Sequence, residues 1–141
     1  MPPLMGLAPG LTAAGALNAA DIEALAASGV KTIVNNRPDN EDPGQLPADA
    51  ARTLCAAHGI AYHHIPFVGA MLSAADIDAF EAVLKSGPRP VVAHCRSGTR
   101  STMIWALTRM RAGDDPAALV ALGARNGVDI SALPALAAKL L

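Results

Sequence analysis

The chain has 141 residues, of which 52% are hydrophobic and 3% aromatic, and its formal net charge is −1. This length suits one domain, residues 1–141, and the near-zero charge provides no field that would attract nucleic acid or an anionic membrane. Two cysteines make no disulfide framework, and no apolar run reaches the roughly 20 residues that span a bilayer. We therefore expect a soluble, cytoplasmic protein.

Capping signals and turn residues divide the first half of the chain into alternating strands and helices. Asn18 followed by Asp21 has the spacing of a capping box, and Gly29 ends the helix that this pair opens. The polar segment 37–47 carries three prolines, so we expect a loop there. The other elements expected in this half are an irregular strand within 5–14, a strand at 31–35, a helix at 48–58 and a strand at 60–65.

The second half continues the alternation. Ser73 and Asp76 form another capping-box pattern, and Asp115 with Pro116 has the pattern of an N-cap and first turn. The elements expected here are a helix from 74 that ends at Gly87, a strand at 90–93, helices at 102–111 and 116–125, and a short helix at 131–141. Such alternation predicts an α/β fold whose sheet is parallel or mostly parallel, with the functional site at the carboxyl ends of its strands.

The segment from His94 to Ser101 carries the strongest chemical signal. It connects the apolar strand 90–93 to the helix that follows, and the free N–H groups at the start of a helix attract anions. Cys95 lies at the mouth of this anion site with Arg96 and Arg100 nearby, which favours the thiolate over the thiol. We interpret Cys95 as a nucleophile rather than as a small buried apolar residue.

The remaining residues of the segment have supporting interpretations. Gly98 lets the backbone turn closely around a ligand. The hydroxyls of Ser97, Thr99 and Ser101 either donate hydrogen bonds to the bound anion or cap the helix. Arg96, Ser97, Gly98, Thr99 and Ser101 are thus the expected substrate-binding residues, with Cys95 and Arg100 as the catalytic pair.

The segment from His94 to Ser101 resembles the active-site loop shared by cysteine-dependent phosphatases and rhodaneses. Tyrosine and dual-specificity phosphatases carry five residues between Cys and Arg, whereas four separate Cys95 from Arg100, a length typical of rhodaneses. With segments 29–39 and 62–66, the chain is similar to a small bacterial family catalogued as β-lactamase-hydrolase-like, phosphatase-like domains or as sulfur transferases. Members of this family often adjoin sulfide-oxidising enzymes.

This resemblance implies a cysteine-phosphatase-like fold of three layers, in which helices flank a mostly parallel sheet and no cofactor is needed. In the phosphatases the histidine before the cysteine orients the loop and tunes the nucleophile, a role that His94 would take here. In the phosphatases the hydroxyl of the residue after the arginine assists the thiolate as a leaving group, and Ser101 occupies that position in this chain.

The missing acid decides between the two chemistries at this stage. A phosphatase protonates its leaving group. Related enzymes use an aspartate for this, in the loop that follows the strand before the catalytic strand. The corresponding segment 66–72 has no carboxylate. Sulfur transfer from thiosulfate or a persulfide needs no acid, because sulfite departs as a stable anion. We therefore expect a sulfurtransferase that carries a persulfide on Cys95 and passes it to a thiol such as glutathione.

Two other functions stay open. A phosphatase would use a phosphocysteine on Cys95, with Asp39 or its neighbours Glu41 and Asp42 as the acid. A redox-sensing or oxyanion-binding module would oxidise Cys95 reversibly, with Cys55 as a resolving thiol. Arg37 either lines the site with Asn35 and Asn36 or only pairs with a nearby carboxylate. No second pair of ligands joins Cys55 and His58, so we expect no metal.

Overall fold

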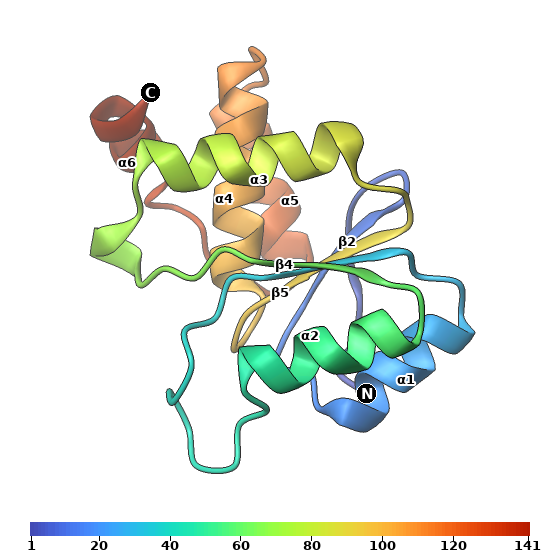
Figure 1. The fold of residues 1–141 in the computed structure, drawn as a ribbon. Coiled ribbons are helices and arrows are strands. Elements are labelled where there is room, and N and C mark those ends of the chain that lie inside the picture. Colours follow the sequence, from blue (N-terminus) through green and yellow to red (C-terminus); the bar gives the residue numbers. More distant parts are fainter.

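The computed structural model describes residues 1–141, and a five-stranded sheet runs through its centre (Figure 1). The strand order is β1-β2-β5-β3-β4. Strands β2 (Leu11–Ala14), β5 (Val91–His94), β3 (Thr32–Asn35) and β4 (Ala61–His64) are parallel, and β1 (Met5–Ala8) pairs antiparallel with β2. The predicted α/β fold with a mostly parallel sheet is confirmed. Because β5 lies between β2 and β3, the loop at its carboxyl end is bordered by the ends of two neighbours.

Helices cover both faces of this sheet and complete three layers (Figure 1). One face packs against α1 (Ala19–Ala27) and α2 (Ala48–Ala57). The other face packs against the remaining helices, which are α3 (Ala74–Ser86), α4 (Thr99–Arg111), α5 (Pro116–Arg125) and α6 (Leu133–Leu140). A single 3₁₀ turn, η1 (Gly69–Met71), lies between β4 and α3.

The inner strands are buried on both faces, as parallel strands usually are. Alternate residues of β3 and β5 face opposite layers, so that Ile33 and Val92 join the core beneath α1 and α2. Val34, Val91 and Ala93 join the larger core, which α3 to α6 complete around Phe80, Ile104 and Leu107. This two-sided packing fixes the end of β5 from which the segment 94–101 begins.

The capping patterns read from the sequence form as expected. The Asn18 side chain accepts from the backbone N–H of Asp21 at 2.8 Å, and the Asp21 carboxylate accepts from the N–H of Asn18 at 2.9 Å. Ser73 and Asp76 make the same reciprocal pair at the start of α3. Each pair satisfies backbone donors that the first helical turn leaves free.

Several boundaries shift by one residue, and three elements differ more clearly from the expected ones. The irregular first strand is a hairpin, because Gly10 adopts φ +71° and turns β1 back onto β2. Helix α4 starts at Thr99 rather than at residue 102, since Gly98 provides the turn that begins it. The last helix starts at Leu133, because Asp129 accepts a hydrogen bond from the N–H of Ser131 and holds a turn there.

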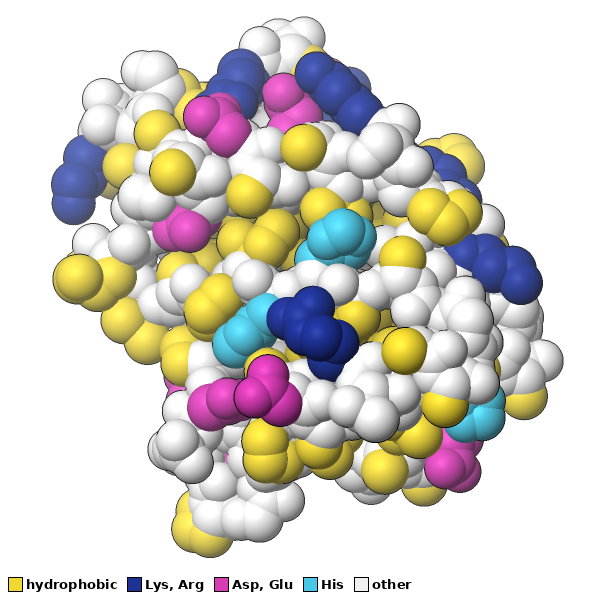
Figure 2. All heavy atoms as spheres, in the orientation of Figure 1, with side chains coloured by type: hydrophobic (Ala, Val, Ile, Leu, Met, Phe, Trp, Pro, Cys, Tyr) yellow, Lys and Arg dark blue, Asp and Glu magenta, His cyan; other side chains and the backbone are white.

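Two surface features bear on partners. No helix of this structure is both long enough and apolar enough to cross a bilayer. On the face shown in Figure 2, Lys and Arg side chains are dispersed among neutral and acidic ones rather than gathered into one patch.

The Ser73 cap gives a direct test of the described helix starts. We expect Ser73→Ala to lower the free energy of unfolding by about 1 kcal/mol, because the first turn of α3 loses a hydrogen-bonded cap. Chemical denaturation measures this change. Ser86→Ala is the matched control, since its exposed hydroxyl only bonds back to the carbonyl of Ala82; an equal loss in both variants would contradict the capping role.

Candidate active site

Cys95 lies where β5 ends, in the interior of the turn that leads into α4. Its side chain is buried, and its sulfur receives a hydrogen bond from the backbone N–H of Gly98 at 3.1 Å. The backbone of Cys95 is itself tied to β2, because its N–H donates to the carbonyl of Ala14 at 3.3 Å. The strand, loop and helix thus aim at least one amide at the sulfur, which is the arrangement that the sequence predicted.

Gly98 begins α4 in a conformation that favours glycine. Its φ is +91°, a left-handed conformation that other residues rarely adopt. A Cβ atom there would lie 2.0 Å from the Cε of Met5 and 3.6 Å from the backbone carbon of Ala14. The carboxyl end of β2 also receives the loop closely, since the N–H of Ala16 donates to the carbonyl of Arg96 at 3.1 Å.

Arg100 is held in place by two partners from other parts of the chain. Its Nη1 and Nη2 donate to the two carboxylate oxygens of Glu41, each at 2.8 Å, and its Nη1 also donates to the carbonyl of Phe67 at 3.2 Å. Hydrogen bonds from Arg100 are the main reason that the pKa of Glu41 falls from 4.5 to about 2, with Arg37 adding to the effect against a smaller opposing effect of burial. Glu41 is therefore ionised at neutral pH.

Two further arginines share a second carboxylate beside this pair. Arg37 is buried and donates from Nε to Glu41 at 3.0 Å and from Nη2 to Asp42. Arg96 is exposed and donates from Nη2 to Asp42 at 3.1 Å. Arg37 thus pairs with carboxylates beside segment 94–101. Three guanidinium groups and two carboxylates surround the mouth of the site, so the side chains alone leave one positive charge for an anion.

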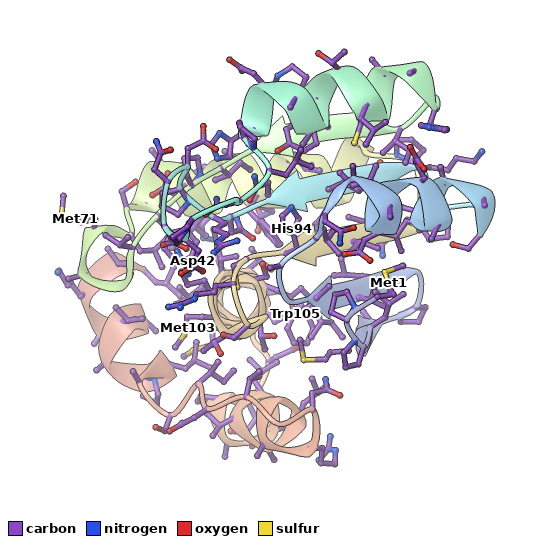
Figure 3. All side chains as sticks on the ribbon, turned by 90° about the horizontal axis from the view of Figure 1, so that it is seen from below. Met1, Asp42, Met71, His94, Met103 and Trp105 are labelled. Atoms are coloured by element: carbon purple, nitrogen blue, oxygen red, sulfur yellow. The ribbon has the colours of Figure 1, made fainter.

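The polar loop that supplies these carboxylates is internally bonded. The Gln45 side chain accepts from the N–H groups of Glu41 and Asp42 at 3.1 and 3.3 Å, and it donates to the carbonyl of Pro38 at 2.8 Å. Figure 3 looks along α4 and shows Asp42 beside the end of this helix. The loop therefore reaches the site as a defined unit.

His94 lies under the loop as a neutral side chain. Burial is the main reason that the pKa of His94 falls to about 4, although a hydrogen bond with the Cys95 backbone opposes the shift. Its Nδ1 is buried without a hydrogen-bond partner. The ring therefore carries no charge at neutral pH, and the positive charge around Cys95 comes from the arginines instead.

The hydroxyl groups of the segment have partners of their own. Ser101 is buried and donates to the Asn36 carbonyl oxygen at 2.8 Å, and the Asn36 amide donates to the carbonyl of Ile65 at 3.0 Å. Ser97 and Thr99 bond to each other at 3.0 Å on the surface. Gly98 is the N-cap of α4 and receives no side-chain cap, so none of the three hydroxyls caps the helix. Asn36 thus links the start of α4 to β3 and β4.

Asp39 does not reach the catalytic loop. Its carboxylate accepts from the N–H of Ala48 at 2.9 Å, and so it caps the start of α2. This placement was not predicted, because Pro47 stands at the N-cap position and the capping aspartate lies nine residues before Ala48 in the sequence. Asp39 is therefore a structural residue, and Glu41 is the carboxylate that contacts Arg100.

Cys55 lies in the other core and is chemically quiet. It belongs to α2 and is fully buried in the core that α1 and α2 form with the sheet, and burial raises the pKa of its thiol to about 11. No disulfide joins it to Cys95. The structure also gathers no group of three His, Cys, Asp or Glu side chains that could hold a metal ion.

Two cavities differ in their relation to the site. A cleft of about 290 Å³ adjoins it, with Ala16, Leu17, Arg37 and Asp42 in its lining. A larger cavity of about 1010 Å³ lies at the opposite end of α4, near Arg109. The smaller cleft is the one beside the Cys95 segment. Residues 95–101 do not line it, but Arg37 and Asp42 do, and Asp42 also binds Arg96.

Comparison with known families identifies the chain. Residues 4–112 match the model of the family described as beta-lactamase hydrolase-like protein, phosphatase-like domain. The chain belongs to this family. A beta-lactamase hydrolase-like protein of Agrobacterium fabrum is 40% identical over 97 residues, which cover 69% of this chain but only 22% of that protein.

Solved structures agree with this family membership. A candidate phosphatase from Neisseria meningitidis is 26% identical and superposes with a TM-score of 0.84 over 96% of both chains. The kinase associated phosphatase is 17% identical and has a TM-score of 0.69, covering 93% of this chain and 89% of its own, which shows the shared fold. The predicted cysteine-phosphatase-like fold is confirmed.

These findings correct the expectation of a sulfurtransferase. The matching family is phosphatase-like, and the Neisseria protein is a phosphatase candidate, so the thiosulfate, persulfide and rhodanese interpretation is wrong. The prediction rested on the short spacing between Cys95 and Arg100 and on the missing acid in segment 66–72, and neither feature excludes a phosphatase-like domain. The structure shows that four intervening residues still place an amide on the sulfur and Arg100 in the first turn of α4.

The ion pair of Glu41 with Arg100 predicts a pH dependence of stability. The pKa of Glu41 is about 2 in the folded protein against an ordinary 4.5, so its stabilising effect is complete above pH 4.5 and is lost as the pH falls towards 2. Glu41→Gln should be less stable than wild type at neutral pH, and the difference should shrink through this window. Denaturation at several pH values measures it. Glu23→Gln, which breaks no ion pair, is the control; a difference that does not change with pH would contradict the assignment.

Proposed function

We propose that this chain is a phosphoric monoester hydrolase that acts through a phosphocysteine on Cys95. The observation that carries the proposal is the buried sulfur that already receives the N–H of Gly98 at 3.1 Å, at the start of a helix with Arg100 in its first turn. A helix start of this kind binds phosphate through its free N–H groups. Family membership supports the same chemistry.

The proposal gives each group a role. The Cys95 sulfur would attack phosphorus while the amides of segment 96–100 and the Arg100 guanidinium bind the phosphoryl oxygens. Donors that are already in place stabilise the charge of the transferring group without having to move. Glu41 and the Phe67 carbonyl hold Arg100 in place before substrate binds. Water would then release phosphate from the sulfur.

Neutral His94 would act as a positioning residue in this scheme. It lies directly before the nucleophile, contacts the Cys95 backbone and carries no charge at neutral pH. We also propose that residues 1–141 act as one catalytic domain, since the elements that hold the site all pack on a single five-stranded sheet.

Hydrolysis of 4-nitrophenyl phosphate tests the proposal. Wild type should release nitrophenol, and Cys95→Ser should fall to the rate of buffer alone, because serine lacks the thiolate nucleophile. Arg100→Lys should lose about 100-fold in kcat/KM, since one donor to the developing charge is removed. The release of 4-nitrophenol followed by absorbance measures all three.

Cys55→Ser is the matched control for the nucleophile. Cys55 is a buried thiol in the opposite core, so this change should leave the rate unaffected once the folded fraction is accounted for. Full activity in Cys95→Ser, or an equal loss in both cysteine variants, would contradict the proposed mechanism.

A further inference from the structure

No carboxylate beside the site is placed to protonate a leaving group. Glu41 is bound to Arg100 and Arg37 and has a pKa of about 2, so it holds no proton at neutral pH. Asp42 is shared between Arg37 and Arg96. Asp39 caps α2. Each acidic side chain of the loop that reaches the site is therefore committed to a partner.

The segment after β4 provides no acid either, although it adjoins the site. The carbonyl of Phe67 accepts from Arg100, so this segment borders the guanidinium. The residues that follow it are apolar or glycine, and Met71 is exposed at the outer edge of the molecule (Figure 3). The next carboxylate, Asp76, is bonded to Ser73 in the capping box of α3.

The histidines near this edge of the sheet show no sign of acting as the acid. His94 is buried and neutral, with a pKa of about 4. Burial, with the Arg52 charge, lowers the pKa of His63, so it is neutral as well. The Nε2 of His64 lies 2.9 Å from the carbonyl of Arg37 and is bonded there.

We propose that the leaving group departs as an oxyanion that no side chain of the protein protonates. The substrate class is then limited to phosphoryl groups on weakly basic oxygens, such as a phenol or a second phosphate, and excludes alkyl phosphates such as phosphoserine. This inference rests on the proposed phosphatase function and deepens it.

The reaction balances without an acid. The Cys95 thiolate supplies the electron pair of the new sulfur–phosphorus bond, and the phosphorus–oxygen bond breaks with its electron pair on the departing oxygen. That oxyanion takes its proton from solvent after it has left. In the second step water attacks phosphorus, the sulfur–phosphorus bond breaks, Cys95 regains its thiolate, and the proton of the water passes to the buffer.

A series of substrates with leaving groups of increasing basicity tests the inference. The probes are substituted phenyl phosphates, inorganic pyrophosphate and O-phosphoserine. A general acid contributes about 100-fold to 10,000-fold to such a step. We expect kcat/KM to fall steeply along the phenyl series, with O-phosphoserine at least about 100-fold below 4-nitrophenyl phosphate. Pyrophosphate turnover distinguishes a phosphoanhydride from an aryl ester as the preferred source of the weakly basic oxygen.

Four variants show whether a hidden acid exists. The variants are Asp39→Asn, Asp42→Asn, His64→Gln and Glu41→Gln. Within each variant, the hydrolysis rates of 4-nitrophenyl phosphate and O-phosphoserine should change by the same factor as each other, since none of these residues donates a proton. A shallow dependence on leaving-group basicity in the wild type would overturn the inference. So would a variant that loses O-phosphoserine hydrolysis selectively and makes the dependence steeper.

The two proposals fail in different ways. If 4-nitrophenyl phosphate is turned over through Cys95 but phosphoserine is turned over as efficiently, only the acid-free inference is overturned. If no phosphate ester or anhydride is cleaved, the phosphatase function is overturned, and the inference falls with it.

Discussion

The site depends on one backbone constraint, the left-handed turn at Gly98 between a strand buried on both faces and a helix buried along most of its length. Only four residues separate Cys95 from Arg100, so this turn must bring an amide back onto the sulfur within a single loop. The φ of +91° is the reason that this position favours glycine, and a side chain added there would also displace the end of the Met5 side chain of β1. The packed sheet thus fixes the position of the Cys95 sulfur relative to the start of α4.

A second constraint is the sharing of two carboxylates among three arginines. Arg37 is buried and pairs with Glu41 and Asp42, which are partly exposed, so these ion pairs hold the loop that carries both carboxylates beside segment 94–101. The same pairs that position Arg100 also keep Glu41 ionised. Positioning the arginine and supplying a proton are therefore incompatible roles for this residue, which links the ion pairs to the choice of leaving group.

The sequence predicts the local parts of this structure better than the long-range ones. The capping pairs at Asn18 and Ser73, and the strand, loop and helix around Cys95, follow from neighbouring residues and were predicted correctly. The pairing of Glu41 with Arg100 and of Asn36 with Ser101 joins residues about 60 positions apart, so it depends on the strand order, which no local pattern fixes. The sulfurtransferase error had another origin, since a short motif spacing and the absence of an acid from segment 66–72 were taken as evidence of the chemistry.

Detection of a phosphocysteine on Cys95 is the most direct test of the claim that Cys95 is the nucleophile. Wild type would be mixed with 4-nitrophenyl phosphate, quenched in acid within the first turnover, and its intact mass and peptides measured beside Cys95→Ser. The account predicts a mass gain of one phosphoryl group on the peptide that contains Cys95, absent from the variant. Turnover without any phosphoryl group on that peptide, or labelling that persists in Cys95→Ser, would contradict it.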